Sequence, residues 1–107
     1  MMVSSCHSKA CFNAWIQCED MLSTLHHSLS RSVSKVIDES ALICMGTFHA
    51  IKNSSRNMQR MAVLCVGICE ECADLCESLD DAALRDCART CRFCSEKLTE
   101  IAFSDWQ

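Results

Sequence analysis

The chain of 107 residues contains no proline and only two glycines, Gly46 and Gly67. Hairpin turns and strand ends depend on these two residue types, so a sheet protein of this sequence would lack most of its turns. Half of the residues are hydrophobic and 22% are charged, which is typical of a chain that folds around a core. The sequence therefore predicts an all-α protein. Residues 1–107 are expected to form one domain, because two smaller domains would each lack a sufficient core.

Clusters of serine, asparagine and aspartate divide the chain into four stretches that we expect to be helical. These side chains favour caps and turns over helix interiors. The expected helices run from about 3 to 26, from a Ser32 or Ser34 cap to about 52, from about 56 to 77, and from a Ser78–Asp81 cap signal to about 103. Short links make sequential helices neighbours, so the expected architecture is an antiparallel up-down-up-down four-helix bundle.

Eleven residues are cysteines, and seven of them lie in two stripes within the third and fourth predicted helices. In the third helix they are spaced four, three and four residues apart, and in the fourth helix four and three apart. At about 100° per residue each set falls on one helix face. Charged residues separate the cysteines, so the cysteine faces are expected to line the core. The seven are Cys65, Cys69, Cys72, Cys76, Cys87, Cys91 and Cys94.

Candidate metal ligands are sparser elsewhere. Met61 and Met58 extend the stripe of the third helix backwards, while the first helix offers Cys11, Cys18 and His7 on one face and the second helix only Cys44. A lone buried cysteine or methionine often serves only as packing, and this alternative stays open for Cys44 and the two methionines. Cys6 falls off the inward face of the first helix. His7 either caps the metal end or lies on the surface, where His26, His27 and His49 are also expected.

We expect the glycines and the aromatic residues to have structural roles. Gly46 and Gly67 are expected to permit close approach of helices. The aromatic residues Phe12, Trp15, Phe48 and Phe93 are expected to pack within the chain or at an interface, and Trp106 to dock a short C-terminal tail.

Several classes of function are disfavoured by composition. A net charge of −4 with scattered lysines and arginines offers no surface for nucleic acid. No Cys–His nucleophile or acid–base pair can be singled out, so we expect no enzyme. The N-terminal residues do not resemble a signal peptide and no membrane span is predicted. An odd number of cysteines cannot pair fully within one chain, so we expect a cytoplasmic protein with reduced thiols that are available to metal ions.

The cysteine spacing suits a soft metal ion. Residues four apart on a helix have Cβ atoms about 5–6 Å apart, and two thiolate bonds to one ion span about 4.6 Å. A C-x-x-x-C pair can therefore hold a two-coordinate Cu(I) ion, which prefers sulfur ligands. The pairs of this kind are Cys65 with Cys69, Cys72 with Cys76, and Cys87 with Cys91.

Zinc is a competing interpretation, because Cys69-x-x-Cys72 and Cys91-x-x-Cys94 look like halves of a four-cysteine site. Zinc knuckles usually come from turns, however, and both pairs lie inside predicted helices. Iron–sulfur clusters are less well matched, since the spacing differs from the ferredoxin run.

The runs LCVGICEECADLCE and LRDCARTCRFC resemble the bacterial cysteine-rich four-helix-bundle family that includes the copper storage proteins. The resemblance covers about residues 58–98 well and the first half loosely. It implies a bundle with a cysteine-lined core, often assembled as a homotetramer, that binds several Cu(I) ions with help from His and Met near its open end. The matched ligands are the seven cysteines of the two stripes and, more weakly, Cys11, Cys18 and Cys44.

One departure bears on the function. Storage members of that family also carry cysteine pairs on the first two helices, whereas neither predicted helix here has a C-x-x-x-C, so fewer ions should fit. The leading interpretation is a cytoplasmic protein that stores or buffers Cu(I), as a homo-oligomer such as a tetramer. Two alternatives stay open: a structural or assembly protein of the same fold with a reduced or absent metal site, and a zinc or redox-sensing module.

Overall fold

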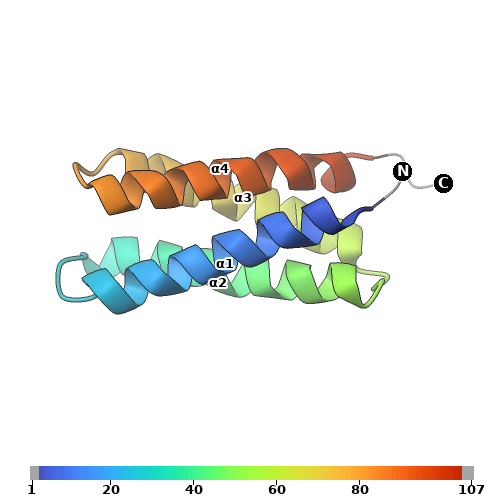
Figure 1. Ribbon diagram of the computed structural model, residues 1–107, viewed down its shortest axis with the longest axis horizontal. Helices are drawn as coiled ribbons and strands as arrows, with labels where there is room; N and C mark the ends of the chain where they lie inside the picture. Colours follow the sequence, from blue (N-terminus) through green and yellow to red (C-terminus); the bar gives the residue numbers. More distant parts are fainter. Residues whose placement is uncertain (1–2, 105–107) are drawn as a thin grey trace.

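The computed structural model describes residues 3–104 and consists of four helices (Figure 1). They are α1 (Ser5–Leu25), α2 (Arg31–Lys52), α3 (Met58–Glu77) and α4 (Ala82–Ala102). Each helix packs against two others in a closed ring, α1 against α2 and α4, and α3 against α2 and α4. The bundle measures 45 × 20 × 20 Å. The predicted all-α, up-down-up-down four-helix bundle is confirmed, while Trp106 lies outside the described residues.

The helix starts differ from prediction by a few residues. The α2 helix begins after Ser30, whose hydroxyl accepts a hydrogen bond from the Val33 N–H at 3.3 Å, so the Ser32 or Ser34 cap is wrong. The α4 helix is capped by Asp81, whose carboxylate accepts from the Leu84 N–H at 3.0 Å. Ser78 instead follows the end of α3 and donates to the Leu75 carbonyl at 2.6 Å. In each case the cap is the side chain that reaches a free N–H of the first turn.

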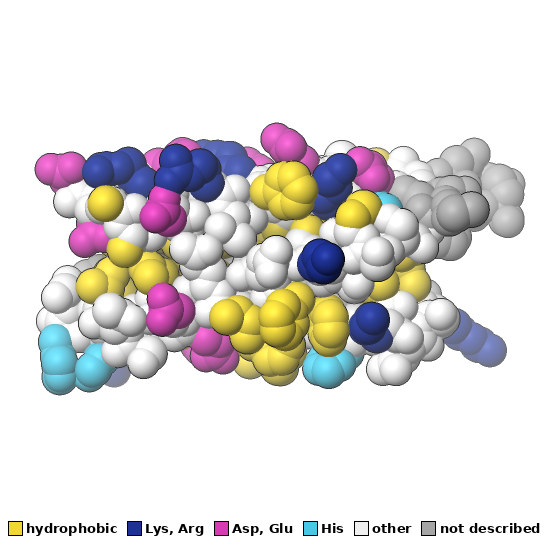
Figure 2. All heavy atoms as spheres, in the orientation of Figure 1, with side chains coloured by type: hydrophobic (Ala, Val, Ile, Leu, Met, Phe, Trp, Pro, Cys, Tyr) yellow, Lys and Arg dark blue, Asp and Glu magenta, His cyan; other side chains and the backbone are white. Residues whose placement is uncertain are grey.

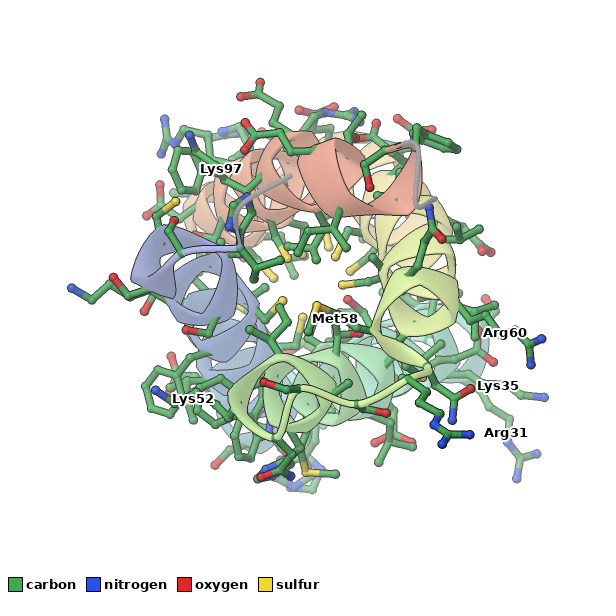
Figure 3. All side chains as sticks on the ribbon, turned by 90° about the vertical axis from the view of Figure 1, so that its right-hand side faces the viewer. Arg31, Lys35, Lys52, Met58, Arg60 and Lys97 are labelled. Atoms are coloured by element: carbon green, nitrogen blue, oxygen red, sulfur yellow. The ribbon has the colours of Figure 1, made fainter. Side chains whose placement is uncertain are left out.

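The core holds sulfur along most of its length. Every described cysteine except Cys6 is buried with no exposed surface. Figure 3, which looks along the bundle, shows sulfur atoms gathered in the interior between the helices. Fully buried alanines such as Ala14, Ala62 and Ala88 let neighbouring helices approach. Leu98 and Ile101 close the core toward the end that carries the chain termini, and Leu84 lies toward the opposite end.

At the surface of the bundle, the α3–α4 pair and the α1–α2 pair are held together by different kinds of contact. Across the α3–α4 seam, the Arg92 guanidinium pairs with three carboxylates, which belong to Glu70, Asp74 and Glu77 at 2.5–2.7 Å. Across the α1–α2 seam the contacts are aromatic: the Phe48 ring centroid lies 5.6 Å from Phe12 and 6.0 Å from Trp15. Phe12, Trp15 and Phe48 therefore pack between helices, as expected, whereas Phe93 is 51% exposed and its ring lies under Lys97 of the same helix.

The two glycines have different surroundings. A Cβ atom at Gly46 would lie 2.9 Å from the Met61 methyl carbon, so this glycine does permit α3 to pack closely on α2. Nothing lies within 4 Å of a Cβ atom at Gly67, so the expectation of a close helix approach there is wrong.

Among residues 3–104, no helix has both the length and the apolar character that crossing a bilayer requires.

Candidate metal centre

Eight of the buried thiols form two groups of four, and within each group all sulfur atoms lie within 4.8 Å of one another. The Cys18 cluster consists of Cys18, Cys72, Cys87 and Cys91, and the Cys44 cluster of Cys44, Cys65, Cys69 and Cys94. Each cluster takes its sulfur atoms from three helices. The Cys18 cluster combines α1, α3 and α4, and the Cys44 cluster combines α2, α3 and α4.

The sulfur atoms in each cluster are close enough to share metal ions. In the Cys44 cluster, Cys44 Sγ lies 3.5 Å from Cys69 Sγ and 3.8 Å from Cys65 Sγ. Cys65 Sγ in turn lies 3.9 Å from Cys69 and 3.8 Å from Cys94. In the Cys18 cluster, Cys18 Sγ lies 4.0 Å from Cys87 and 3.9 Å from Cys91. All of these separations are shorter than the span of about 4.6 Å of two thiolate bonds to one ion.

The remaining buried thiols extend the two clusters along the bundle axis. Cys11 interacts with Cys65 and Cys94 and so flanks the Cys44 cluster. Cys76 interacts with Cys72 and Cys87 and so flanks the Cys18 cluster. The two clusters are themselves linked between Cys69 and Cys91. The ten buried cysteines thus form one continuous row of sulfur inside the bundle, which we call the thiol channel.

One thiol in each cluster is favoured as a thiolate. Hydrogen bonding from Cys11, and then from Cys44, lowers the pKa of Cys65 well below its ordinary value. Hydrogen bonding with Cys18, and then with Cys69, lowers the pKa of Cys91 in the same way. Several thiols donate to a single sulfur in each case, and such donation stabilises its negative charge. A thiolate is the form that binds metal, so each cluster holds a ligand that is ready to bind.

The pKa values of other thiols in the two clusters are raised instead of lowered. Hydrogen bonding with Cys18 is the largest cause that raises the pKa of both Cys72 and Cys87, and burial raises both further. Hydrogen bonding with Cys44 raises the pKa of Cys69, and burial again adds to the effect. Cys76 is an exception, because hydrogen bonds from Cys72 and Cys87 lower its pKa to about 4. Most cluster thiols therefore carry protons that a metal ion must displace.

The candidate ligands other than cysteine lie at or beyond one end of the thiol channel. Met58 is half-buried and lies inside the ring of helices at the end that carries the chain termini (Figure 3). The Met61 methyl group lies against Gly46, in the seam between α2 and α3. Cys6 is exposed, with its sulfur 2.9 Å from the Ser4 hydroxyl, and does not join either cluster.

His7 is buried, with 3% of its surface exposed, so the expectation of a surface histidine is wrong for this residue. Its Nδ1 accepts a hydrogen bond from the Ser4 N–H at 3.0 Å, and its Nε2 donates to the Glu100 carboxylate at 2.8 Å. Both ring nitrogens are engaged, so His7 could bind metal only after one of these bonds breaks. His26, His27 and His49 are exposed, as expected.

Sequence reasoning overlooked a serine in the thiol channel. Ser40 has no exposed surface, and the Cys18 thiol donates a hydrogen bond to its Oγ at 3.6 Å. The signal was present in the sequence, because Ser40 lies four residues before Cys44, the spacing of a C-x-x-x-C pair with a hydroxyl in place of one thiol.

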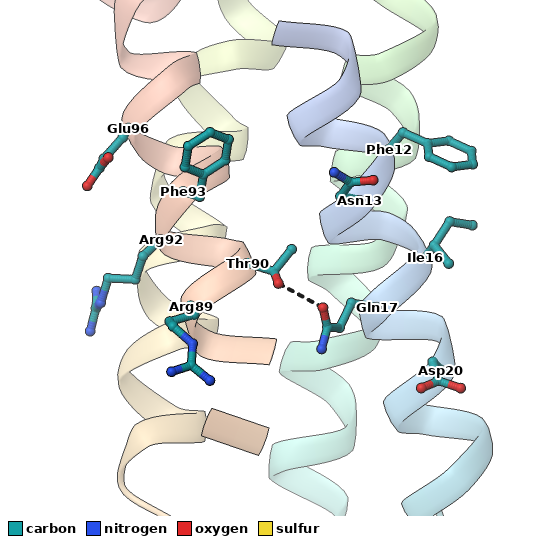
Figure 4. Close-up of a pocket in the computed structure, with 10 residues that line it drawn as sticks. All are labelled: Phe12, Asn13, Ile16, Gln17, Asp20, Arg89, Thr90, Arg92, Phe93 and Glu96. Carbon is teal, nitrogen blue, oxygen red and sulfur yellow. Dashed lines mark hydrogen bonds between the residues drawn. The ribbon is translucent and has the colours of Figure 1, made fainter. Parts of the chain in front are cut away.

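An open groove of about 890 Å³ lies between α1 and α4 on the outside of the bundle (Figure 4). Phe12, Ile16 and Phe93 give it apolar walls, and the Thr90 hydroxyl donates to the Gln17 side-chain carbonyl across it at 2.7 Å. No cysteine is among its lining residues. The groove is therefore separate from the candidate metal centre.

Comparison with known proteins agrees with this architecture. The family model for the copper storage protein matches residues 2–103. Among solved structures, Cu(I)-bound Copper Storage Protein BsCsp3 is similar to this chain, with a TM-score of 0.86 and 24% sequence identity. That match covers 92% of this chain and 97% of the other. No curated protein matches this chain in sequence.

Proposed function

Because this chain belongs to the copper storage protein family, we propose that it stores or buffers copper by binding several Cu(I) ions in the thiol channel. The observation that carries the proposal is the convergence of four sulfur atoms in each of two fully buried clusters. A core built only for stability would be expected to use leucine and isoleucine at such positions. The similarity to a Cu(I)-bound copper storage protein supports the same conclusion.

Charge balance favours a monovalent ion. Thiolate charges inside a dry core are costly unless positive charge neutralises them. Four thiolates are neutralised by about four Cu(I) ions, and this arrangement works if each sulfur bridges two ions of low coordination number. The two clusters together would then hold about eight ions, and the flanking Cys11 and Cys76 could bind further copper.

Zinc is the second candidate, because the sulfur separations of 3.5–4.0 Å also suit a tetrahedral site with four thiolates. One Zn²⁺ per cluster would leave each site with two excess negative charges. The part of the channel that the structure describes has no buried cation beside the clusters to offset them, since its buried polar residues are histidine, serine and threonine. This difference in residual charge favours copper.

The proposed ligands are the eight cysteines of the two clusters, which Cys11 and Cys76 extend. Met58 is proposed to assist at the end of the channel that carries the chain termini. Met61 and His7 are weaker proposals, since the first packs against Gly46 and the second uses both ring nitrogens in hydrogen bonds.

The proposal also covers the cellular location of the protein and its oligomeric state. Free thiols in this number call for a reducing compartment, which supports a cytoplasmic location. Phe12 is exposed beside the half-buried rings of Trp15 and Phe48, and hydrophobic side chains gather on the face shown in Figure 2, which supports assembly into a homo-oligomer. Storage requires no catalytic group, so the proposed role is binding and not catalysis.

Anaerobic titration of the reduced protein with Cu(I), in competition with a chromophoric chelator, tests the proposed function. We expect saturation at about eight ions per chain, with no copper left on the chelator until the clusters are full. Saturation at one ion or fewer would remove storage as a function. Uptake of about two Zn²⁺ ions per chain in preference to Cu(I) would support the second candidate. Failure to take up either metal, with disulfide-linked multimers on oxidation, would support a structural role instead.

A further inference from the structure

Ser40 differs from two other buried hydroxyl residues, Thr47 and Ser8, in the group that its hydroxyl contacts. It lies on the inward face of α2, four residues before Cys44, and has no exposed surface. Among the described residues, its one hydrogen-bond partner is the Cys18 thiol, which donates to Ser40 Oγ at 3.6 Å. The hydroxyl is thus in contact with a member of the Cys18 cluster.

Thr47 provides an internal comparison on the same helix face. It is also fully buried, but its hydroxyl donates to two backbone carbonyls, Ile43 at 2.7 Å and Met61 at 3.3 Å. Ser8, on α1, likewise donates to the backbone, at the Ser5 carbonyl. Donation to the carbonyl one turn earlier is a common arrangement for serine and threonine inside a helix. The Ser40 hydroxyl proton has no such acceptor in the part of the chain that the structure describes.

Copper binding would change this hydrogen bond. When Cu(I) binds Cys18, an S–Cu bond forms, the S–H bond breaks, and the proton leaves to solvent. The sulfur then has no proton to donate, and the bond to Ser40 persists only if the hydroxyl turns and donates to the thiolate. A buried hydroxyl proton that lacks an acceptor in the metal-free protein thereby gains a charged one.

We propose that Ser40 is a positioning residue of the Cu(I) store, which donates a hydrogen bond to the Cys18 sulfur of the copper-loaded Cys18 cluster and strengthens copper binding there. This inference rests on the proposed function, because it requires Cu(I) in the cluster. Partners that orient and hydrogen-bond metal ligands commonly affect metal affinity by about 10–100-fold. The Cys44 cluster lacks a contact of this kind among the described residues, so the two clusters should differ in affinity.

The test compares Ser40→Ala with the matched control Thr47→Val, which removes a hydroxyl of equal burial from the same helix face. In anaerobic Cu(I) competition titrations, Ser40→Ala is expected to weaken about half of the bound ions by about tenfold and to leave the rest unchanged. The sulfur-to-copper charge-transfer absorption should also move to longer wavelength, because loss of the hydrogen bond raises the energy of the sulfur lone pairs. Thr47→Val should change neither measurement, and Ser40→Thr, which keeps the hydroxyl, should restore both.

Equal affinities and spectra in Ser40→Ala and the parent protein would overturn the role of Ser40. A loss of Cu(I) affinity in Thr47→Val as large as that in Ser40→Ala would overturn it as well. If Ser40→Ala does not fold, Ser40→Cys serves instead, because it is close to serine in size. It removes the hydroxyl that contacts Cys18, so the affinity of about half of the ions and the charge-transfer spectrum should both differ from those of the parent, whereas an unchanged affinity and spectrum would overturn the proposal. A parent protein that binds no Cu(I) would overturn the proposed function together with this inference. A parent that binds copper while Ser40→Ala matches it would overturn this inference alone.

Discussion

The α3–α4 half of the bundle supplies seven buried thiols and the α1–α2 half supplies three, yet neither half forms a complete cluster alone. Each cluster takes three sulfur atoms from α3 and α4 and one from the opposite half, Cys18 from α1 or Cys44 from α2. The dense stripes therefore provide most of the ligands, while single cysteines of the sparse half complete each set of four. The number of cysteines on a helix does not measure the importance of each one.

The largest expected effect comes from the point where the two clusters meet. The double substitution Cys69→Ser with Cys91→Ser removes one sulfur from each cluster and also breaks the link between them. We expect the Cu(I) capacity to fall to less than about half, because three thiolates cannot enclose the same set of bridged ions. Anaerobic titration measures the capacity, and Cys6→Ser, which changes an exposed cysteine, is the control. A loss of only about two ions would mean that the cysteines bind copper independently and not as clusters.

A second experiment compares the two halves directly. If Cys18 and Cys44 complete the clusters, Cys18→Ser and Cys44→Ser should each lower the capacity as much as Cys72→Ser does. We expect a loss of about two to four ions in each variant, measured by copper and protein analysis after gel filtration. Substantially smaller losses from the sparse half would show that Cys18 and Cys44 serve as packing, the alternative that a lone buried cysteine always carries.

Much of the fold follows from sequence because its determinants are local. The absence of proline, the polar breaks and the 3.6-residue period predict four helices and the inward face of each. Which sulfur atoms meet depends on how far each helix is shifted along its antiparallel neighbours, and spacing within one helix does not determine this. The predicted partners Cys65 and Cys69 do lie together, whereas Cys72 joins Cys18 and Cys76 only flanks that cluster.

The burial of His7 and Ser40 has a similar explanation. His7 is covered because Glu100, 93 residues away on α4, meets its Nε2 atom. Ser40 acquires its role because Cys18, on another helix, comes within 3.6 Å. Contacts between distant residues of this kind come from tertiary packing, and no pattern within a single helix reveals them.

Proton competition should give the copper affinity a steep pH dependence in both clusters. Hydrogen bonding and burial raise the pKa of Cys69, Cys72 and Cys87, so these thiols remain protonated at neutral pH and each must lose its proton to bind copper. Lowering the pH adds competing protons, and the apparent affinity should therefore fall, by about tenfold or more per pH unit between about pH 8 and 5.5. Competition titrations at a series of pH values measure this slope.

Cys76 provides the contrast, because its pKa of about 4 keeps it deprotonated throughout this range. Cys76→Ser should leave the slope of affinity against pH unchanged. A pH-independent affinity of the parent protein would contradict the account of proton displacement.

The smallest expected effect concerns the two glycines, one in each half. Gly67→Ala places a methyl group in open space at an exposed position of α3 and should stabilise the metal-free protein by about 0.5–1 kcal/mol. Gly46→Ala gains the same helix propensity, but its Cβ atom would lie 2.9 Å from the Met61 methyl carbon, which must move. We expect Gly46→Ala to be less stable than Gly67→Ala by about 1 kcal/mol in chemical denaturation. Equal stabilities would show that Met61 does not pack tightly on α2.

Anomalous X-ray diffraction at the copper absorption edge, on crystals of the Cu(I)-loaded protein, tests the central claim most directly. The account predicts two groups of copper peaks inside the bundle, one among the sulfur atoms of the Cys18 cluster and one among those of the Cys44 cluster. Copper found only at exposed positions, such as Cys6 or the neighbouring rings of His26 and His27, with none in the thiol channel, would contradict it.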